Sequence, residues 1–285
     1  MSPSISSLHL PNDYEPNEQE RPALVPPARG LGASDVAMRP PSIYGSRKAS
    51  LVLNIIVVGC GIGGLSAALC LTQAGHRVTI IEAYPTVGEF GAGIQLTPNS
   101  TRLLRRWGLG EHLKKVAIRP EGIAHLRYST GERVGFTRMG EALEGNYGAA
   151  YYHTHRADVH KFLYDLVAPH ATILLGSTVI GCDPDPVSPS VTLKSGEVIH
   201  ADLIVGADGV RSYIQQVVSG RPHPAKLTGD AVYRATIPAS LLRQDPELRE
   251  LIEYPQMTVW FGPGKFTAGY LIVRSPPFQV PARVC

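Results

Sequence analysis

The chain has 285 residues, of which 44% are hydrophobic and 18% charged, and its formal net charge is +3 at pH 7. This length and composition suit one large or two modest globular domains, and charges that are scattered rather than blocked argue against a nucleic-acid interface. The four cysteines show neither C-x-x-C spacing nor a nearby histidine cluster, which argues against a metal site or a disulfide framework and favours reduced thiols in a cytoplasmic protein.

Residues 1–50 differ from the rest of the chain. Proline, serine and glutamate are frequent there, and no apolar period persists. Such a composition cannot bury enough apolar surface to offset the entropy of ordering the chain. We therefore expect a disordered extension, with folded structure beginning near Leu51.

Residues 54–82 read as strand, turn, helix and strand. Ile55–Val58 is a short β-branched run suited to a strand buried on both faces, and Val78–Ile81 has the same character. Gly63–Ala74 is the expected helix, which Gly75 ends. The almost uncharged stretch here also resembles a membrane anchor, but the glycines that interrupt it fit a turn and not a spanning helix. We expect no membrane association.

The turn of this unit carries the pattern G-x-G-x-x-G. Gly59 permits a tight turn, Gly61 lets a pyrophosphate approach the backbone, and Gly64 lets the helix pack on the strand. The helix N-terminus then faces the phosphates, where its dipole favours negative charge. Glu82 ends the second strand, where a carboxylate binds the ribose hydroxyls and repels a 2′-phosphate. The unit predicts a site for the adenosine diphosphate half of a dinucleotide.

An amphipathic helix is expected from Ser100 to Trp107. Leu103, Leu104 and Trp107 are at helical spacing, so we expect all three in the core. A second helix is expected over Ala157–Val167.

Two hairpins are expected between and after these helices. His125–Tyr128 and Arg133–Thr137 flank one turn, and Val191–Lys194 and Val198–Ile199 flank another. Strand and helix patterns alternate, which predicts an α/β fold with a central parallel sheet and inserted antiparallel elements.

A second cluster of small residues follows the later hairpin, where the strand Ala201–Val205 breaks at Gly206-Ala207-Asp208-Gly209. An acid and a glycine at the end of a parallel strand occupy the edge where ligands bind. By residue pattern alone, Asp208-Gly209 is equally consistent with an ordinary strand-to-helix cap.

Four ordered motifs now stand together, and each can be read in the printed sequence: Gly59 to Gly64 with Glu82, Gly91 to Asn99, His155 to Asp158, and Gly206 to Ser212. In this combination the chain resembles the FAD-dependent aromatic hydroxylases, in particular the salicylate-hydroxylase-like flavoprotein monooxygenases that include fungal enzymes of secondary metabolism. The resemblance extends from about Leu51 to Tyr270.

The resemblance implies a role for several residues. Glu82 matches the acid that binds the adenosine ribose of FAD, Gly93 a backbone contact near the flavin, and Arg156 an arginine that reaches the FAD at the domain border. A surface arginine opening a helix is the alternative for Arg156, although basic groups are disfavoured there. Asp208 and Gly209 match the motif that contacts the pyrophosphate and helps NAD(P)H to dock.

The resemblance also implies two catalytic residues. Residues 229–238 resemble the strand that enters the substrate domain, and their Arg234 matches a proposed active-site residue. Tyr270 matches a tyrosine that the family usually follows with proline, where this chain has Leu271. An arginine beside a phenol favours the phenolate, and a tyrosine hydroxyl can orient the same oxygen. An ion pair at a strand edge and half-buried packing are the alternatives.

These inferences combine into one expected architecture and reaction. We expect a doubly wound, Rossmann-like FAD-binding domain over residues 51–222 and a β-rich, incomplete substrate domain over 223–285. The implied reaction is NAD(P)H-dependent hydroxylation of a small aromatic or phenolic molecule by O2, through a flavin C4a-hydroperoxide. Two alternatives stay open: a simple NAD-dependent dehydrogenase, and a non-catalytic remnant that binds a nucleotide.

The family continues into a second FAD motif, a Gly-Asp pair followed by a helix, and nothing like it occurs before Cys285. The last residues, 276–285, are irregular and match no family element. We therefore expect a C-terminally truncated chain that hydroxylates poorly by itself.

Overall fold

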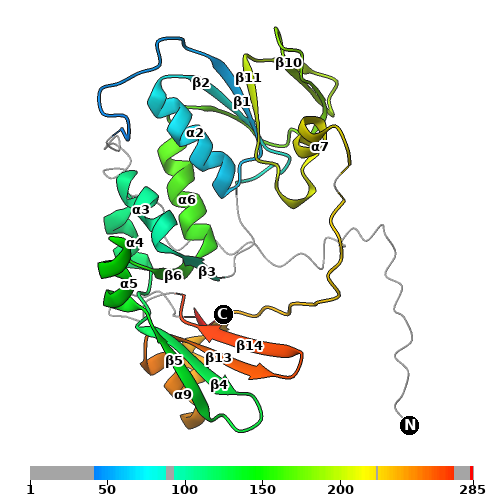
Figure 1. The fold of residues 1–285 in the computed structure, drawn as a ribbon. Helices are drawn as coiled ribbons and strands as arrows, with labels where there is room; N and C mark the ends of the chain where they lie inside the picture. The colour runs from blue at the N-terminus through cyan, green and yellow to red at the C-terminus, as the bar shows by residue number, and fades with distance from the viewer. Residues whose placement is uncertain (1–41, 88–92, 223, 273–282, 285) are drawn as a thin grey trace, which may run out of the picture.

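The computed structural model describes residues 42–87, 93–222, 224–272 and 283–284. Its first layer is built on a parallel sheet, drawn in the upper part of Figure 1, where β1, β2 and β11 are labelled. The four strands of this sheet are β1 (Asn54–Val58), β2 (Arg77–Ile81), β7 (Thr172–Leu174) and β11 (Leu203–Gly206). The strand order is β11-β1-β2-β7, and every neighbouring pair is parallel. The expected α/β, Rossmann-like fold is confirmed.

Two helices cover one face of this sheet, α2 (Ile62–Ala74) and α6 (Arg156–Val167), which lie side by side in Figure 1. Successive strand residues point to opposite faces, so Val57 and Ile80 face these helices. They pack with Leu65, Leu69 and Leu163 in a core whose members are almost entirely buried. This core fixes both helices relative to the ends of β1 and β2.

The opposite face of the sheet is covered by a small antiparallel sheet and a helix. They are β8 (Val179–Asp183), β9 (Ser190–Leu193), β10 (Val198–His200) and α7 (Tyr213–Ser219). Val191 and Ile214 contribute to the core that Ile56 and Val58 form on this face. The expected hairpin is β9–β10, with Val198 opposite Thr192. Apolar residues on both sides of β1 explain its continuous hydrophobic run.

Below the paired helices lie α3 (Pro98–Arg106), α4 (Gly110–Val116), α5 (Gly140–Tyr147) and the two-stranded sheet of β3 (Gly93–Leu96) and β6 (Tyr152–His155). Leu104 and Trp107 are buried as expected. The expectation for Leu103 is wrong, because its side chain is 43% exposed. The buried face of α3 carries Thr101 and Leu104, and it is too narrow to include Leu103.

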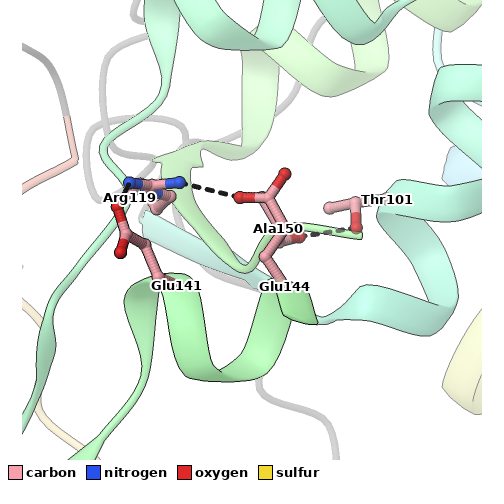
Figure 2. A network of polar contacts seen from close by, with 5 residues as sticks. All are labelled: Thr101, Arg119, Glu141, Glu144 and Ala150. Carbon is pink, nitrogen blue, oxygen red and sulfur yellow. Dashed lines mark hydrogen bonds and ion pairs between the residues drawn. The ribbon is translucent and has the colours of Figure 1, made fainter. Parts of the chain in front are cut away.

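Polar contacts attach α5 to its neighbours, as Figure 2 shows. Arg119 bonds to Glu144 at 2.7 Å and lies 3.7 Å from Glu141, and Thr101 Oγ1 donates to the Ala150 carbonyl at 2.6 Å. The ion pairs are solvent-exposed and contribute little. The buried Thr101 bond joins α3 to the segment that enters β6.

The second layer is a four-stranded sheet in the order β14-β13-β4-β5, drawn at the bottom of Figure 1. Its strands are β4 (Gly122–Arg127), β5 (Arg133–Arg138), β13 (Gln256–Gly262) and β14 (Lys265–Tyr270). β4–β5 is the other expected hairpin. β4 of this hairpin pairs with β13. Residues that the sequence placed in the FAD-binding domain thus share a sheet with the segment after residue 222. The boundary at 222 therefore does not separate the two sheets.

The end of the described chain departs from expectation in two places. Residues 229–238 were expected to form a strand, but only Ile237–Pro238 (β12) does, and it pairs with Arg283–Val284 (β15). Among the described residues, no strand lies beside residues 229–236 to accept their backbone hydrogen bonds. β15 also corrects the expectation that residues 276–285 are irregular throughout; the rest of that segment lies outside the described residues. Between β12 and β13 lie α8 (Ala239–Leu242) and α9 (Pro246–Glu253).

Folded structure also begins earlier than Leu51. Ile43 packs against the α2/α6 core and donates from its backbone N–H to Gln73 Oε1, while Lys48 Nζ donates to the Gln73 carbonyl. These contacts explain why residues 42–50 are ordered despite their polar composition; residues 1–41 lie outside the described part. No helix among the described residues has the length and hydrophobicity to cross a membrane.

Candidate cofactor-binding site

The packing of the glycine loop between β1 and α2 explains why glycine is required at two of its positions. Gly59 has φ +103°, and a Cβ there would lie 2.4 Å from the Ala207 carbonyl oxygen. A Cβ on Gly64 would lie 1.9 Å from the Gly59 carbonyl oxygen, so only glycine lets α2 start this close to the strand. A Cβ on Gly61 would meet no atom within 4 Å. The loop is packed at Gly59 and Gly64 and open at Gly61.

The N-terminus of α2 opens on the same loop. Gly61 is its N-cap, no side chain caps it in the described chain, and no acidic residue lies in its first turn. The first N–H groups of a helix need partners from outside it, and the helix dipole makes an anion the favoured one. An open loop and an uncapped helix of 13 residues fit a pyrophosphate.

Glu82 at the end of β2 is already oriented by the backbone. Its Oε2 accepts from the Cys60 N–H at 2.7 Å and its Oε1 from the Tyr84 N–H at 2.9 Å. Each carboxylate oxygen has a further lone pair, so both can still accept from hydroxyl groups. Burial, and secondarily the Glu82 charge, raise the pKa of the Cys60 thiol to about 11, so this thiol is protonated and unreactive at neutral pH.

His160 on α6 is a loop contact that the sequence analysis missed. Its Nε2 lies 2.7 Å from the Cys60 carbonyl oxygen, and its side chain is buried. Because a carbonyl only accepts, Nε2 carries the proton. Burial is the main cause that lowers the pKa of His160, so the imidazole is neutral. The spacing of His160 four residues after Arg156, on the same helix face, is the sequence signal that could have found it.

Arg156 is the first residue of α6, which begins one residue before the helix expected over Ala157–Val167. The preceding residue, His155, caps the helix by accepting from the Ala157 N–H at 3.3 Å. Arg156 is half-buried, and burial lowers its pKa. His155 is also paired with Gly93 across β6 and β3. The structure thus brings Arg156 and Gly93 to one edge of the first layer, and their contact with a cofactor stays a prediction.

Asp208 serves as a cap in this structure. Its Oδ2 accepts from the N–H groups of Tyr213 and Ile214 at 2.7 and 3.1 Å, and its Oδ1 accepts from the Ser212 hydroxyl. Gly209 follows with φ +81° and begins a short 3-10 helix, Gly209–Arg211. Asp208 therefore caps the start of α7. A role for Asp208 and Gly209 toward the pyrophosphate or NAD(P)H stays a prediction.

Gly93 and Tyr270 come together where the two layers meet. A Cβ on Gly93 would lie 2.5 Å from Ile272 Cγ2 and 2.8 Å from the Tyr270 hydroxyl, so the absence of a side chain makes room for both. The Tyr270 ring lies 4.6 Å from that of His153, which is edge-on to Tyr151. His153 and Tyr151 belong to no sequence motif and were therefore not among the expected site residues.

The cluster at this junction is polar and buried. Tyr151 donates to Gln95 Oε1 at 2.5 Å, and burial raises the pKa of Tyr151 to about 12. Burial lowers the pKa of His153 to about 4, and neither ring nitrogen has a hydrogen-bond partner among the described residues. Both side chains are neutral at pH 7. The junction therefore offers hydrogen-bonding groups without net charge.

Arg234 is not part of this cluster. It is exposed, lies outside any helix or strand, and makes no ion pair or hydrogen bond within the described residues. The alternative, an ion pair at a strand edge, is not found there either. Among the described residues no group of His, Cys, Asp or Glu could hold a metal ion.

Comparison with known proteins identifies the family to which the chain is similar. The sequence profile described as "FAD binding domain" matches residues 52–264. The chain is 35% identical to "3-amino-4-hydroxybenzoate 2-monooxygenase" of Streptomyces cremeus over 219 residues, covering 76% of this chain and 53% of the relative. It is 33% identical to "3-hydroxybenzoate 6-hydroxylase 1" of Aquipseudomonas alcaligenes, covering 80% and 56%. With "FAD-dependent monooxygenase cfoG" of Aspergillus candidus the identity is 37%, covering 70% and 47%.

Solved structures share the fold. CtdE in complex with FAD and a substrate matches with a TM-score of 0.70 at 22% identity, covering 81% of this chain and 56% of that one. FqzB matches with a TM-score of 0.65 at 25% identity, covering 84% and 54%. The chain spans about half the length of the curated relatives it matches.

Proposed function

Because the chain belongs to the FAD binding domain family, we propose that it is the cofactor-binding part of a flavoprotein monooxygenase that hydroxylates a small aromatic or phenolic molecule. The observation that carries the proposal is the glycine loop, which is open at Gly61, next to an uncapped helix N-terminus and an oriented Glu82. Each of these features fits one portion of an adenosine diphosphate group.

In this proposal, different residues bind different parts of the FAD molecule. The Gly61 backbone and the start of α2 hold the pyrophosphate, and Glu82 accepts from the ribose hydroxyls. Arg156 and Gly93, at the lower edge of the first layer, lie toward the flavin end, and Asp208 and Gly209 supply the second loop beside the pyrophosphate. When bound, FAD supplies the redox and oxygen-transfer chemistry, with NAD(P)H as reductant and O2 as the oxygen source.

The substrate lies at the junction of the two layers in this proposal. Tyr270 and the neutral His153 are there, beside Gly93, and can direct a phenolic oxygen without adding charge. Arg234 stays a candidate for stabilising a phenolate, although it is exposed in the described structure. Relatives named for hydroxybenzoates make a hydroxybenzoate-like acid the first substrate class to try.

We place the protein in the cytoplasm, in the secondary metabolism of its source, because the described cysteines are free thiols and FAD-dependent relatives come from fungi such as Aspergillus candidus. NADH and NADPH are both candidates for the reductant, since no residue that selects between them is identified.

The test is titration of the purified chain with FAD, followed by flavin fluorescence and the visible spectrum. Saturable quenching that NAD⁺ in excess does not reverse supports the proposal. Binding of NAD⁺ in preference to FAD would favour the dehydrogenase alternative, and binding of neither would contradict the proposal. NADH or NADPH oxidation with product analysis across hydroxybenzoates then tests the reaction.

A further inference from the structure

The peptide unit that joins Cys60 to Gly61 lies between α6 and the open side of the glycine loop. On the α6 side, its carbonyl oxygen accepts from His160 Nε2 at 2.7 Å. On the other side, a Cβ on Gly61 would meet nothing within 4 Å. No acceptor for the Gly61 N–H is found among the described residues. One peptide unit thus has a fixed oxygen and a free N–H.

The geometry of a trans peptide links these two groups. The C=O and N–H of one peptide unit point in opposite directions, and the described chain has no cis peptide bond. A carbonyl held toward His160 therefore turns the Gly61 N–H away from α6, to the open side of the loop. If the unit rotated, its oxygen would face a pyrophosphate and repel it.

The preceding peptide unit is held from the other direction. The Cys60 N–H donates to Glu82 Oε2 at 2.7 Å, and the Cys60 side chain is buried in the α2/α6 core. Rotation of the loop is thus opposed at the Cys60 N–H by Glu82 and at the Cys60 carbonyl by His160. Glu82 is explained by its place in the nucleotide motif, whereas nothing in that motif calls for a histidine on α6.

We propose that His160 is a positioning residue for the dinucleotide: it holds the Cys60–Gly61 peptide so that the Gly61 N–H donates to the pyrophosphate. The inference rests on the proposed function, because it requires FAD at this loop. The same helix carries Arg156 one turn earlier, so α6 fixes the glycine loop with one residue and approaches the flavin end with another.

Three variants separate this role from that of a buried histidine that only fills space. His160→Leu keeps much of the volume but removes the donor. His160→Asn keeps an amide that is too short to reach the Cys60 carbonyl, and His160→Gln places an amide N–H where Nε2 lies. His112→Leu is the control, because His112 is half-buried and contacts α6 through Phe162, with ring centroids 5.7 Å apart, away from the loop.

The measurements are FAD affinity by flavin fluorescence, adenosine affinity by calorimetry, and thermal unfolding of the apo chain by circular dichroism. Loss of one hydrogen bond to a charged phosphate predicts FAD binding about 10- to 100-fold weaker for His160→Leu and His160→Asn. Adenosine, which has no phosphate, should bind as to wild type. His160→Gln should restore FAD affinity, and His112→Leu should not change it.

Each outcome bears on the inference. A folded His160→Leu or His160→Asn chain with wild-type FAD affinity would overturn it, and so would a folded His160→Gln chain that binds as weakly as the others. Equal losses for FAD and adenosine would show general damage to the site instead of a role toward the pyrophosphate, and would overturn it too. If wild type itself does not bind FAD, the proposed function fails and not only this inference.

Discussion

Gly61→Ala and Gly64→Ala add the same methyl group three residues apart, and the structure predicts opposite consequences. At Gly64 the new Cβ would lie 1.9 Å from the Gly59 carbonyl oxygen, a backbone atom that cannot swing away. At Gly61 it would enter open space, and the backbone there (φ −71°, ψ 179°) suits alanine. We expect the first to damage folding and the second to damage cofactor binding alone.

The magnitudes follow from these contacts. Overpacking costs about 1–3 kcal/mol, with Gly64→Ala toward the upper end, and should lower the apo-chain Tm by roughly 2–10 °C. For Gly61→Ala, a gain of about 0.4–1 kcal/mol from a less flexible unfolded chain is offset by a loss of about the same size at the N-cap, where glycine is preferred to alanine. The stability of that variant should stay within about 0.5 kcal/mol of wild type.

The assay is circular dichroism melting of both apo chains with FAD titration of the folded ones. Gly61→Ala should melt like wild type and bind FAD about 10-fold or more weakly, as expected when a methyl group displaces one charged hydrogen bond. If Gly61→Ala lowered the Tm as much as Gly64→Ala, or bound FAD normally, the division of tasks within the loop would be wrong.

Three further predictions concern single side chains. Glu82→Ala should weaken FAD binding by roughly 1.5–3 kcal/mol in calorimetry, and an unchanged affinity would remove Glu82 from the site. Asp208→Ala should lower the free energy of unfolding in urea by about 0.5–2 kcal/mol through loss of the cap, and no change would contradict the cap. His153→Phe removes two buried nitrogens that have no hydrogen-bond partner among the described residues and should stabilise the chain by about 1 kcal/mol. Because the folded pKa of His153 is about 4 and its ordinary value 6.5, wild type should also lose stability relative to His153→Phe as pH falls from 6.5 to 4, by up to about 3 kcal/mol, and parallel pH profiles of the two chains would refute this.

The sequence predicted best where local patterns decide the structure. The β1–α2–β2 unit, both hairpins and α6 lie where the glycines and apolar periods indicate. The sequence-based expectations failed where partners are distant. Ile43 and Lys48 bond to Gln73 on α2, and residues 229–236 have no neighbouring strand within the described part of the chain. Propensity alone cannot supply a missing sheet partner.

The site shows the same limit. Motif residues such as Gly59 and Glu82 were found because phosphate and ribose binding impose fixed spacings on the chain. His160 was missed because its four-residue spacing from Arg156 occurs on any helix face and does not by itself indicate a site, and His153 was missed because it belongs to no motif. Their burial and contacts depend on how α6 packs on the loop and how β14 packs against β6.

The pairing of β4 with β13 joins strands that are far apart in the sequence, with Gly122 opposite Gln256 and with α5, α6 and β7 to β11 between them. A ribosome therefore releases the β4–β5 hairpin well before its parallel partner exists, and the hairpin must wait with β4 as an open edge. Closing that sheet late makes it the slow, aggregation-exposed step of folding. The same arrangement makes the chain suited to a fragment experiment. If the chain is cut between α7 and β12, β4 lies on one fragment and β13 on the other, so the sheet can form only when the two fragments bind each other. The affinity of the two fragments then measures how strongly this sheet closes.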